Sequence, residues 1–373
     1  MALKKINRED LEPLLEGTAI FGTGGGGSPD WGRKIMLNDF KRGRRYAIID
    51  PQEVEDDALV VSGGVMGSVK ILDNMNFDGL LEYWEDNFEL KVAFREMGKE
   101  LGKKIDYIVP FEMGGLNTPI ILSLGARVGV PVVDGDALGR AAPETQMTSF
   151  IGHGISLTPM PLVDHIGNVV VVKKAVNPVY PDQIGRFIIT RGGGLGANNH
   201  YPMSGRQLKN SVIPNTISKA IKIGKSVINA RNSGENPVQV FRKIVSGINI
   251  FHGKITEIIE EEAEGFYFTK VKLSGLEKDN NSSCELVIKN ETMACWKNGE
   301  LRVVFPDLLC MLDPKTGRGI MSVELKKNLE LKLVAMPCHE RLREALKHPD
   351  GKIAFSSKRY GQNIKYVPLE ELH

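Results

Sequence analysis

Three acidic residues follow apolar segments in the middle of the chain, where their carboxylates can carry out acid–base chemistry. Glu112 follows the apolar run "YIVPF", and Asp134 and Asp136 flank Gly135 after the run "VPVV". Clustered carboxylates can share a proton, act as a general base or bind a divalent metal. We therefore expect Glu112, Asp134 and Asp136 to be catalytic. Asp136 has a competing role, because it is also placed to cap the segment "ALGRA".

A glycine-rich segment, "FGTGGGGSPDWG" at residues 21–32, offers backbone groups rather than side chains. Consecutive glycines let N–H groups approach a ligand closely, and Ser-Pro can begin a helix whose N-terminus favours negative charge. The segment is no P-loop, since lysine is absent until Lys34, and no dinucleotide loop, since a helix is expected before it. We expect its ligand-binding residues to be Gly24, Gly25, Gly26, Gly27 and Ser28. The alternative is a tight turn packed against a neighbouring strand.

Further polar or small residues follow the same apolar segments. The other candidate binding residues are Gly64, Asn117, Arg140 and Glu144. Arg140 can hold a substrate carboxylate in a bidentate pair, or it can pair with Asp134 or Glu144, and both alternatives stay open. The histidines form no metal-type spacing. A divalent metal such as zinc, held by His200 and carboxylates, is an open alternative that the spacing neither requires nor excludes.

The elements that must position these residues are strands alternating with helices. Three apolar strands end in glycine-plus-polar clusters: "SGGVMGS", "FEMGGLN" and "VVDGDALGR". In open parallel sheets, ligands bind outside the carboxyl ends of the strands. We therefore predict an α/β fold in which a mostly parallel N-terminal sheet with flanking helices positions one pocket.

The pattern changes after about residue 165. Helices are predicted up to about residue 246, with Pro214 interrupting one of them, and short strands at hairpin spacing follow from about residue 248. We predict an N-terminal α/β domain over residues 1–165 and a C-terminal domain over 166–373 that ends in an antiparallel sheet or small barrel. The helices before residue 246 can pack back on the first domain.

Composition excludes several classes of protein. The chain has 373 residues, 42% of them hydrophobic and 25% charged, with a formal net charge of +2. This balance is ordinary for a globular protein and gives no reason to expect nucleic acid as a partner. No apolar stretch is long enough to cross a membrane, and the N-terminus has no signal-peptide core. The four cysteines have no metal-type spacing, which favours reduced thiols and a cytoplasmic location.

The motifs taken together resemble one known family. "GTGGGGSP", "VVSGGVMGS", "FEMGGLNTP", "GVPVVDGDALGRAAPETQMTSF" and "FPDLLCMLDPKTGRGI" resemble the family long labelled domain of unknown function 917, some members of which are called S-methyl-thiohydantoin desulfurases. The resemblance covers nearly the whole chain. It implies an N-terminal α/β domain, a C-terminal domain of β-structure and an association with hydantoin utilisation.

The resemblance implies hydrolysis of a hydantoin or thiohydantoin-like cyclic amide ring, in which water attacks the ring carbon. Glu112 or Asp134 would be the general base, and glycine-loop N–H groups or Asn117 would stabilise the developing charge. The alternative is a ligand-binding or accessory protein that serves a hydantoinase or oxoprolinase-type partner. A nucleotide-dependent enzyme is a third alternative, which the missing lysine disfavours. In each case we expect a small-molecule ligand and a homo-oligomer.

Overall fold

The N-terminal half is built around an eight-stranded sheet with helices on both sides. In the computed structural model, which describes residues 3–67, 76–263 and 266–373, the strand order is β1-β2-β5-β4-β3-β9-β7-β8. The pairs β2–β5, β5–β4 and β4–β3 are parallel, and the pairs toward either edge are antiparallel. The strands are β1 Lys4–Ile6, β2 Tyr46–Ile49, β3 Leu59–Gly67, β4 Tyr107–Pro110, β5 Val132–Val133, β7 Met160–Asp164, β8 Val169–Val172 and β9 Leu195–Ser204.

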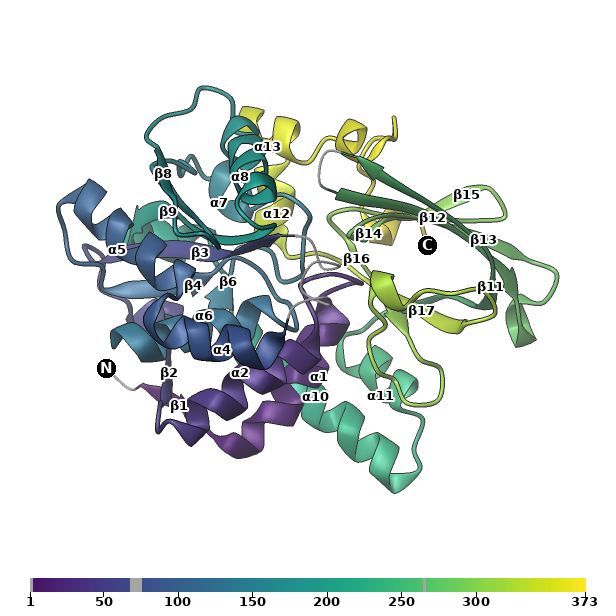
Figure 1. The fold of residues 1–373 in the computed structure, drawn as a ribbon. Helices are drawn as coiled ribbons and strands as arrows, with labels where there is room; N and C mark the ends of the chain where they lie inside the picture. Colours follow the sequence, from purple (N-terminus) through teal and green to yellow (C-terminus); the bar gives the residue numbers. More distant parts are fainter. Residues whose placement is uncertain (1–2, 68–75, 264–265) are drawn as a thin grey trace.

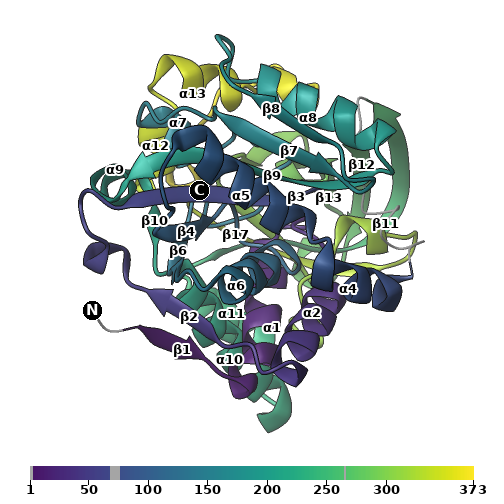
Figure 2. The ribbon, with the colours of Figure 1, turned by 60° about the vertical axis from the view of Figure 1, so that its left-hand side comes forward.

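Helices cover both faces of this sheet. Figure 1 shows α8 and α13 above the sheet and α1, α2 and α6 below it, and the turned view in Figure 2 keeps this arrangement. The helices are α1 Leu11–Phe21, α2 Pro29–Lys41, α4 Phe77–Asp86, α5 Glu89–Leu101, α6 Asn117–Val128, α7 Ser149–Gly152, α8 Tyr180–Arg191, α9 Gly205–Ser211, α10 Thr216–Ser233, α11 Pro237–Ile244, α12 Glu340–Ala345 and α13 Pro349–Ala354.

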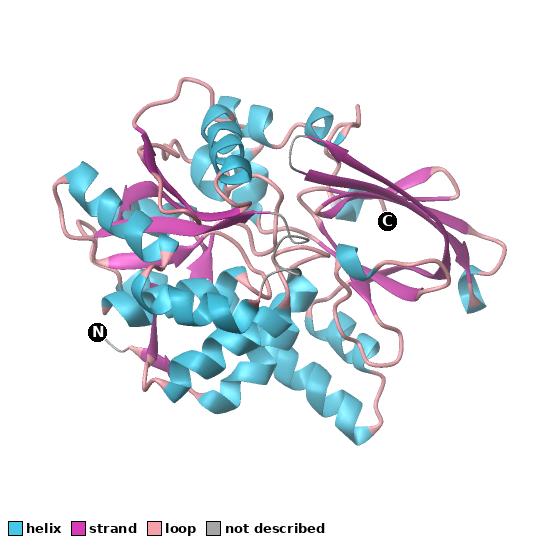
Figure 3. Ribbon diagram, viewed as in Figure 1, coloured by secondary structure: helices cyan, strands magenta, loops and turns pink. Residues whose placement is uncertain are grey.

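A second sheet of seven antiparallel strands forms the C-terminal part and curls into a half-barrel, seen to the right in Figure 3. Its order is β15-β14-β13-β12-β11-β17-β16. The strands are β11 Ile248–Ala263, β12 Phe266–Gly275, β13 Ser283–Lys289, β14 Glu291–Lys297, β15 Glu300–Val304, β16 Leu308–Leu312 and β17 Glu330–Met336. The predicted fold class is therefore confirmed, with the addition that the first sheet has antiparallel flanks.

The segment between the two sheets joins the N-terminal half. β9 pairs with β3 over most of its length, and α10 packs against α1. A short strand, β10 Ile213–Pro214, pairs with β6 Gly135–Asp136 and separates α9 from α10, so the interruption predicted at Pro214 is confirmed. The domain boundary at residue 165 stays a prediction.

Two helices, α4 and α5, follow one another in a segment without proline. The proline-free segment after residue 77 forms α4 and α5, which are separated at Asn87 and Phe88. Phe88 takes an extended backbone conformation, which turns its ring into the core, 5.2 Å from Trp84 and 5.0 Å from the guanidinium of Arg127. Tertiary burial of this aromatic side chain therefore outweighs the helix propensity of the segment.

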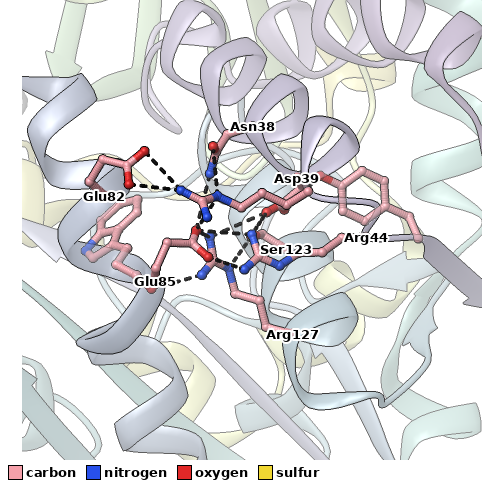
Figure 4. Close-up of polar contacts among 10 residues, drawn as sticks. Asn38, Asp39, Arg44, Glu82, Glu85, Ser123 and Arg127 are labelled. Atoms are coloured by element: carbon pink, nitrogen blue, oxygen red, sulfur yellow. Dashed lines mark hydrogen bonds and ion pairs between the residues drawn. The ribbon is translucent and has the colours of Figure 1, made fainter.

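A buried ion-pair network ties α2, α4 and α6 together (Figure 4). Asp39 is fully buried and pairs with Arg44 at 2.8 Å and with Arg127 at 3.4 Å. Arg127 also contacts Glu85 at 3.0 Å, and Tyr46 donates to Asp39 at 2.9 Å. Since every charge in the network has an opposite partner, its burial is compensated, and it fixes the helices that carry the glycine loop and Asn117. Across the described ranges, no helix is long and apolar enough to cross a membrane.

Candidate functional site

A cavity of about 130 Å³ lies where the carboxyl ends of β3 and β4 meet the half-barrel. The glycine loop, the ends of β3 and β4, the first residue of α6 and residues 142–145 line it from the N-terminal half. Residues of α8 and β9, the turn at 290–291 and residues 321–323 complete its wall. An apolar cavity of roughly 150 Å³ is known to hold benzene, so this space fits one small ring.

The glycine loop forms one wall of this cavity. Gly24, Gly25, Gly26 and Gly27 all line it, and three of them have positive φ, at +98° for Gly24, +74° for Gly26 and +78° for Gly27. A Cβ on Gly26 would lie 2.5 Å from the Cα of Gly114 in the loop after β4. Glycine is therefore required both by the backbone conformation and by the close approach of the two loops. The loop is therefore a tight turn packed against a neighbouring segment, and it also lines the cavity.

The carbonyl groups of the loop fasten it to its surroundings. Gly26 O accepts hydrogen bonds from the N–H groups of Leu116 at 3.0 Å and Asn117 at 3.2 Å, at the start of α6. Gly24 O accepts from the N–H of Ser322 at 2.8 Å. Within the described parts of the chain, the N–H groups of Gly24 and Gly27 have no acceptor. The carbonyl groups of Gly24 and Gly26 therefore hold the loop in place, and the N–H groups of Gly24 and Gly27 remain as donors beside the cavity.

Two buried carboxyl groups meet in the cavity, Glu112 from the loop after β4 and Glu291 from the first residue of β14. Each side chain is 3% exposed. Glu112 Oε1 accepts from Asn117 Nδ2 at 2.5 Å, and its Oε2 accepts from the N–H of Ala142 at 2.8 Å. Glu291 Oε1 accepts from the N–H of Gly26 at 3.3 Å, whereas its Oε2 has no partner among the described residues.

The environment raises the proton affinity of both carboxyl groups. Burial raises the pKa of Glu291 to about 7, although the Arg140 guanidinium opposes this shift. Burial, together with the charge of Glu291, raises the pKa of Glu112 well above its ordinary value. The two groups are electrostatically coupled, so the charge of one favours protonation of the other. The hydrogen bonds that Glu112 accepts from Asn117 and Ala142 favour its charged form and oppose the rise of its pKa.

The pairing of β3 with β9 builds the opposite wall. Gly64 lies opposite Asn198, and Ser62 opposite His200. Asn198 and His200 both line the cavity, as expected for alternate residues of one strand, and Gly64 has open space where a Cβ would stand. Burial lowers the pKa of His200 to about 3, so its ring is neutral. His200 packs edge-on against Phe111, with ring centroids 5.6 Å apart.

A cationic side chain that sequence reasoning did not select, Arg186 of α8, also lines the cavity. Its Nε donates to Asp182 at 2.8 Å, and Asp182 also accepts from the N–H and the hydroxyl of Thr145. The guanidinium carbon lies 3.7 Å from the centroid of the Phe266 ring. Asp182 therefore braces two lining residues, Arg186 and Thr145, at the same time.

Glu144 lines the cavity, but its charge is already compensated. It pairs with Lys289 at 2.5 Å and with Arg359, and it accepts from Gln146 Nε2 at 2.6 Å. These contacts join residues 142–145 to β13 and to the C-terminal segment. The predicted role of Glu144 in substrate binding stays a prediction, and its contacts favour a structural bridge.

Three predicted site residues lie outside the lining of the cavity and have evident structural contacts. Asp134 accepts from the N–H of Ser218 at 3.0 Å and from its hydroxyl, in the first turn of α10. Asp136 Oδ1 accepts from the N–H groups of Leu138 and Gly139, but residues 137–141 form a bend and no helix, so the expected helix cap is wrong. Ser28 caps α2 by accepting from Asp30 N at 3.2 Å. These placements give no support to catalysis by Asp134 or Asp136 or to ligand binding by Ser28.

Arg140 is also placed outside the lining, and it is fully buried. Its guanidinium donates to the carbonyls of Ala141 at 2.9 Å, Asp307 at 2.8 Å and Thr292 at 2.7 Å, and to the hydroxyl of Thr23 at 2.9 Å. Neither alternative from the sequence describes this residue, because it pairs with neither Asp134 nor Glu144 and does not face the cavity. It joins the glycine loop to β14 and to the turn before β16.

The described residues contain no group of three histidine, cysteine or acidic side chains arranged to hold a metal ion. His200 Nδ1 is buried without a hydrogen-bond partner in this part of the chain. All four cysteines are free and buried.

Comparison with known proteins identifies the family. A family model described as "S-Me-THD-like, N-terminal domain" matches residues 9–174, and one described as "S-Me-THD-like, C-terminal domain" matches residues 176–369. The chain belongs to the S-Me-THD-like family. A crystal structure of a protein from Chromobacterium violaceum shares the fold of this S-Me-THD-like chain, with a TM-score of 0.78, 22% identity, and coverage of 98% of this chain and 100% of that one. No curated protein matches.

The cavity lies between the two matched regions of this S-Me-THD-like chain. The glycine loop and Glu112 belong to the N-terminal region, whereas Arg186, Asn198 and Glu291 belong to the C-terminal one. Sequence reasoning missed these three, because it assigned ligand contacts to strand ends before residue 150. Glu291 stands in "KNETM", which reads as an ordinary hairpin turn, and Arg186 stands on a helix with no motif around it.

Proposed function

We propose that this chain is a hydrolase that replaces the sulfur substituent of a hydantoin-like ring with oxygen. The observation that carries the proposal is that two buried carboxyl groups, each with a raised pKa, line a cavity of about 130 Å³, the size of one small ring. The family description, which names an S-Me-THD-like domain, supports the same class of ligand. A carboxylate beside a carboxylic acid supplies a base and an acid at neutral pH.

The proposed reaction uses the two groups in alternation. The Glu112 carboxylate takes a proton from water as the water oxygen bonds to the ring carbon, and Glu291 gives its proton to the ring nitrogen. When the carbon–sulfur bond breaks, the new hydroxyl returns a proton to Glu291, and Glu112 gives its proton to the departing thiolate. Water is consumed, a ring carbonyl and a thiol are formed, and both residues recover their starting states.

The surrounding hydrogen-bond donors can stabilise the charged groups that form during the proposed reaction. Asn117 Nδ2 and the N–H of Ala142 donate to Glu112 and favour its charged form, the form that accepts a proton from water, against the effect of burial. The N–H groups of Gly24 and Gly27 are donors for negative charge that develops on the ring. Neutral His200 and the Asn198 amide can hydrogen-bond ring N–H and C=O groups, which gives the pocket its preference for a cyclic amide.

Turnover of a 2-methylsulfanyl-substituted hydantoin tests the proposal, with methanethiol release followed by a thiol reagent. We expect Glu112→Gln and Glu291→Gln each to lower kcat by two or more orders of magnitude, as removal of a positioned acid or base does. Exposed Glu9→Gln is the matched control and should turn over like the wild type. Full turnover by a folded Glu112→Gln variant would refute the assignment.

The pH dependence of the rate gives a second test. We expect a bell-shaped profile, because the active pair carries one proton and is inactivated by gaining a second or losing the first. The alkaline limb should fall near pH 7, where Glu291 loses its proton, and should disappear from the residual activity of Glu291→Gln. Ring binding that stabilises the wild type against heat without any thiol release would favour the ligand-binding alternative.

A further inference from the structure

The strand β8 lies at the margin of the first sheet and pairs with β7 alone (Figure 2). It consists of four valines in succession, Val169–Val172, and its register with β7 runs without a bulge. Among the described residues, none of its backbone N–H or C=O groups has a hydrogen-bond partner outside β7. A regular, apolar edge with unpaired backbone groups is a template for another strand.

The hydrogen bonds between β7 and β8 show which backbone groups of β8 face outward. The N–H of Asp164, at the end of β7, donates to the carbonyl of Asn168, just before β8, at 3.1 Å. In an antiparallel pair, the residues that exchange hydrogen bonds alternate along each strand. The even-numbered residues of β8 therefore bond to β7, whereas Val169 and Val171 point their N–H and C=O groups away from the sheet.

Apolar side chains are exposed on β8 and at both of its ends. Ile166, in the turn before β8, is 68% exposed, and Val176, four residues after β8, is 97% exposed. These are the two highest values among the large hydrophobic side chains that the structure describes. Val169 and Val170, which point to opposite faces of the sheet, are also exposed. An exposed apolar surface of this kind marks a site of protein–protein contact.

We propose that β8 pairs antiparallel with β8 of a second copy of this chain, which joins the two sheets into one around a two-fold axis. In such a pair, two-fold symmetry places one residue opposite its own counterpart. Val171 fits this central position, because its backbone groups point outward. Of the possible centres, it is also the one that places Val176 opposite Ile166 of the second copy, so that the two most exposed apolar side chains cover one another.

The charges beside β8 agree with this register. Lys173 lies opposite Val169 of the second copy, and Lys174 lies opposite Asn168, so no lysine faces a lysine. The Lys173 ammonium also pairs with Glu100 of α5 at 3.0 Å within its own chain. A shift of the centre by two residues toward the C-terminus would place Lys173 opposite its own counterpart, and like charges directly opposite one another destabilise a sheet.

The dimer leaves the proposed active site free. In the strand order, β7 separates β8 from β9, which carries two of the residues that line the first cavity. The pairing of β8 therefore adds a strand at the far side of β7 and covers none of the described residues that line that cavity. The dimer does not depend on the proposed reaction, and its tests measure mass and cross-linking.

Cysteine substitution tests the register. Residues of a hydrogen-bonded antiparallel pair have Cα atoms about 5.5 Å apart, which a disulfide can span. We therefore expect Val171→Cys to give a disulfide-linked dimer on copper-catalysed oxidation by air, seen on a non-reducing gel. Val169→Cys on the same strand is the matched control, since it lies roughly 14 Å along the strand from its own counterpart and should not cross-link. The native cysteines are all buried.

Sedimentation velocity at micromolar concentration tests the dimer itself. We expect the wild type to sediment with the mass of two chains. Val171→Pro removes an outward N–H and keeps the bonds to β7, so this variant should fold and sediment as one chain. Ile259→Lys, at an exposed position of β11 in the half-barrel, is the control and should stay a dimer.

Three results would overturn the proposal. The first is a wild-type chain that sediments as a monomer throughout the micromolar range. The second is a folded Val171→Pro variant that remains a dimer, since the contact would then lie elsewhere. The third is a Val169→Cys variant that cross-links as readily as Val171→Cys, which would contradict the register centred on Val171.

Discussion

At Gly25, one added carbon atom would displace the carboxyl group of Glu291 and leave the fold nearly unchanged. A Cβ there would lie 1.8 Å from Glu291 Oε1, whereas ordinary contact begins at 3.4 Å, so the carboxyl group must move by about 1.6 Å. That movement exceeds what the 3.3 Å hydrogen bond from Gly26 N–H can follow. Since misplacing a reacting group by about 1 Å can cost roughly a hundredfold in rate, we expect Gly25→Ala to lower kcat by about that factor.

The same substitution should leave the fold nearly intact. Gly25 is not among the glycines with positive φ, so alanine can adopt its backbone conformation, and the atoms it meets belong to a long side chain that can swing away. We expect the midpoint of thermal unfolding to change by only a few degrees. Gly64→Ala, which adds the same carbon to the same cavity with nothing within 4 Å, is the control.

Turnover of the methylsulfanyl hydantoin by both variants, measured beside their thermal unfolding, decides the matter. We expect Gly25→Ala to lose kcat and Gly64→Ala to change mainly KM, because only the first displaces a reacting group. If Gly25→Ala keeps the wild-type kcat and pH profile, the position of Glu291 against the glycine loop is not what makes the pair work.

Three further outcomes concern stability. Burial raises the pKa of Asp136 from 3.8 to about 7 in the folded protein. Between these pH values the folded state binds a proton that the unfolded state does not. The free energy of unfolding of the wild type therefore falls as pH rises from 3.8 to 7, by roughly 4 kcal/mol at most. Asp136→Asn should therefore unfold at a higher temperature than the wild type at pH 8, with the gap closing by pH 5; an equal gap at both pH values would contradict this. Asp134→Ala removes the carboxylate at the start of α10 and should cost about 1–2 kcal/mol of unfolding free energy with kcat unchanged, whereas a lost kcat at normal stability would restore Asp134 as a catalytic residue. Arg127→Met should cost about 3 kcal/mol in denaturant unfolding because it removes one of the two cations that pair with buried Asp39 and also a partner of Glu85. Arg42→Met, whose Glu82 partner is exposed, should cost less than about 1 kcal/mol, and equal costs would refute the network.

Local sequence patterns predicted several of the residues that line the cavity. Strand ends rich in glycine mark where a parallel sheet opens, and this rule predicted that Gly64, Glu112 and Asn117 lie around one cavity, as they do. The same rule selected Asp134, because a strand end does not reveal which way a side chain turns. In the folded chain that side chain faces α10.

The remaining part of the site depends on contacts between distant segments. Glu291 approaches Gly26 across 265 positions of sequence, through a hairpin whose local pattern is that of any antiparallel turn. Arg186 reaches the cavity only because Asp182 and Phe266 hold its side chain there. Single-sequence periodicity reports burial and element type, and it carries no information on which side chains of separate elements meet.

The division of the carboxyl pair between two regions of the chain has a consequence for their relative motion. Glu112 follows β4 of the first sheet and Glu291 begins β14 of the half-barrel, so any movement of the half-barrel away from the first sheet also parts the two acids. Once parted and hydrated, each acid returns toward its ordinary pKa, and a proton bound because of burial is lost to solvent at neutral pH. Opening is therefore linked to proton release, and mild acidity holds the two regions together. A proton bound to either acid therefore favours the state in which the half-barrel lies against the first sheet.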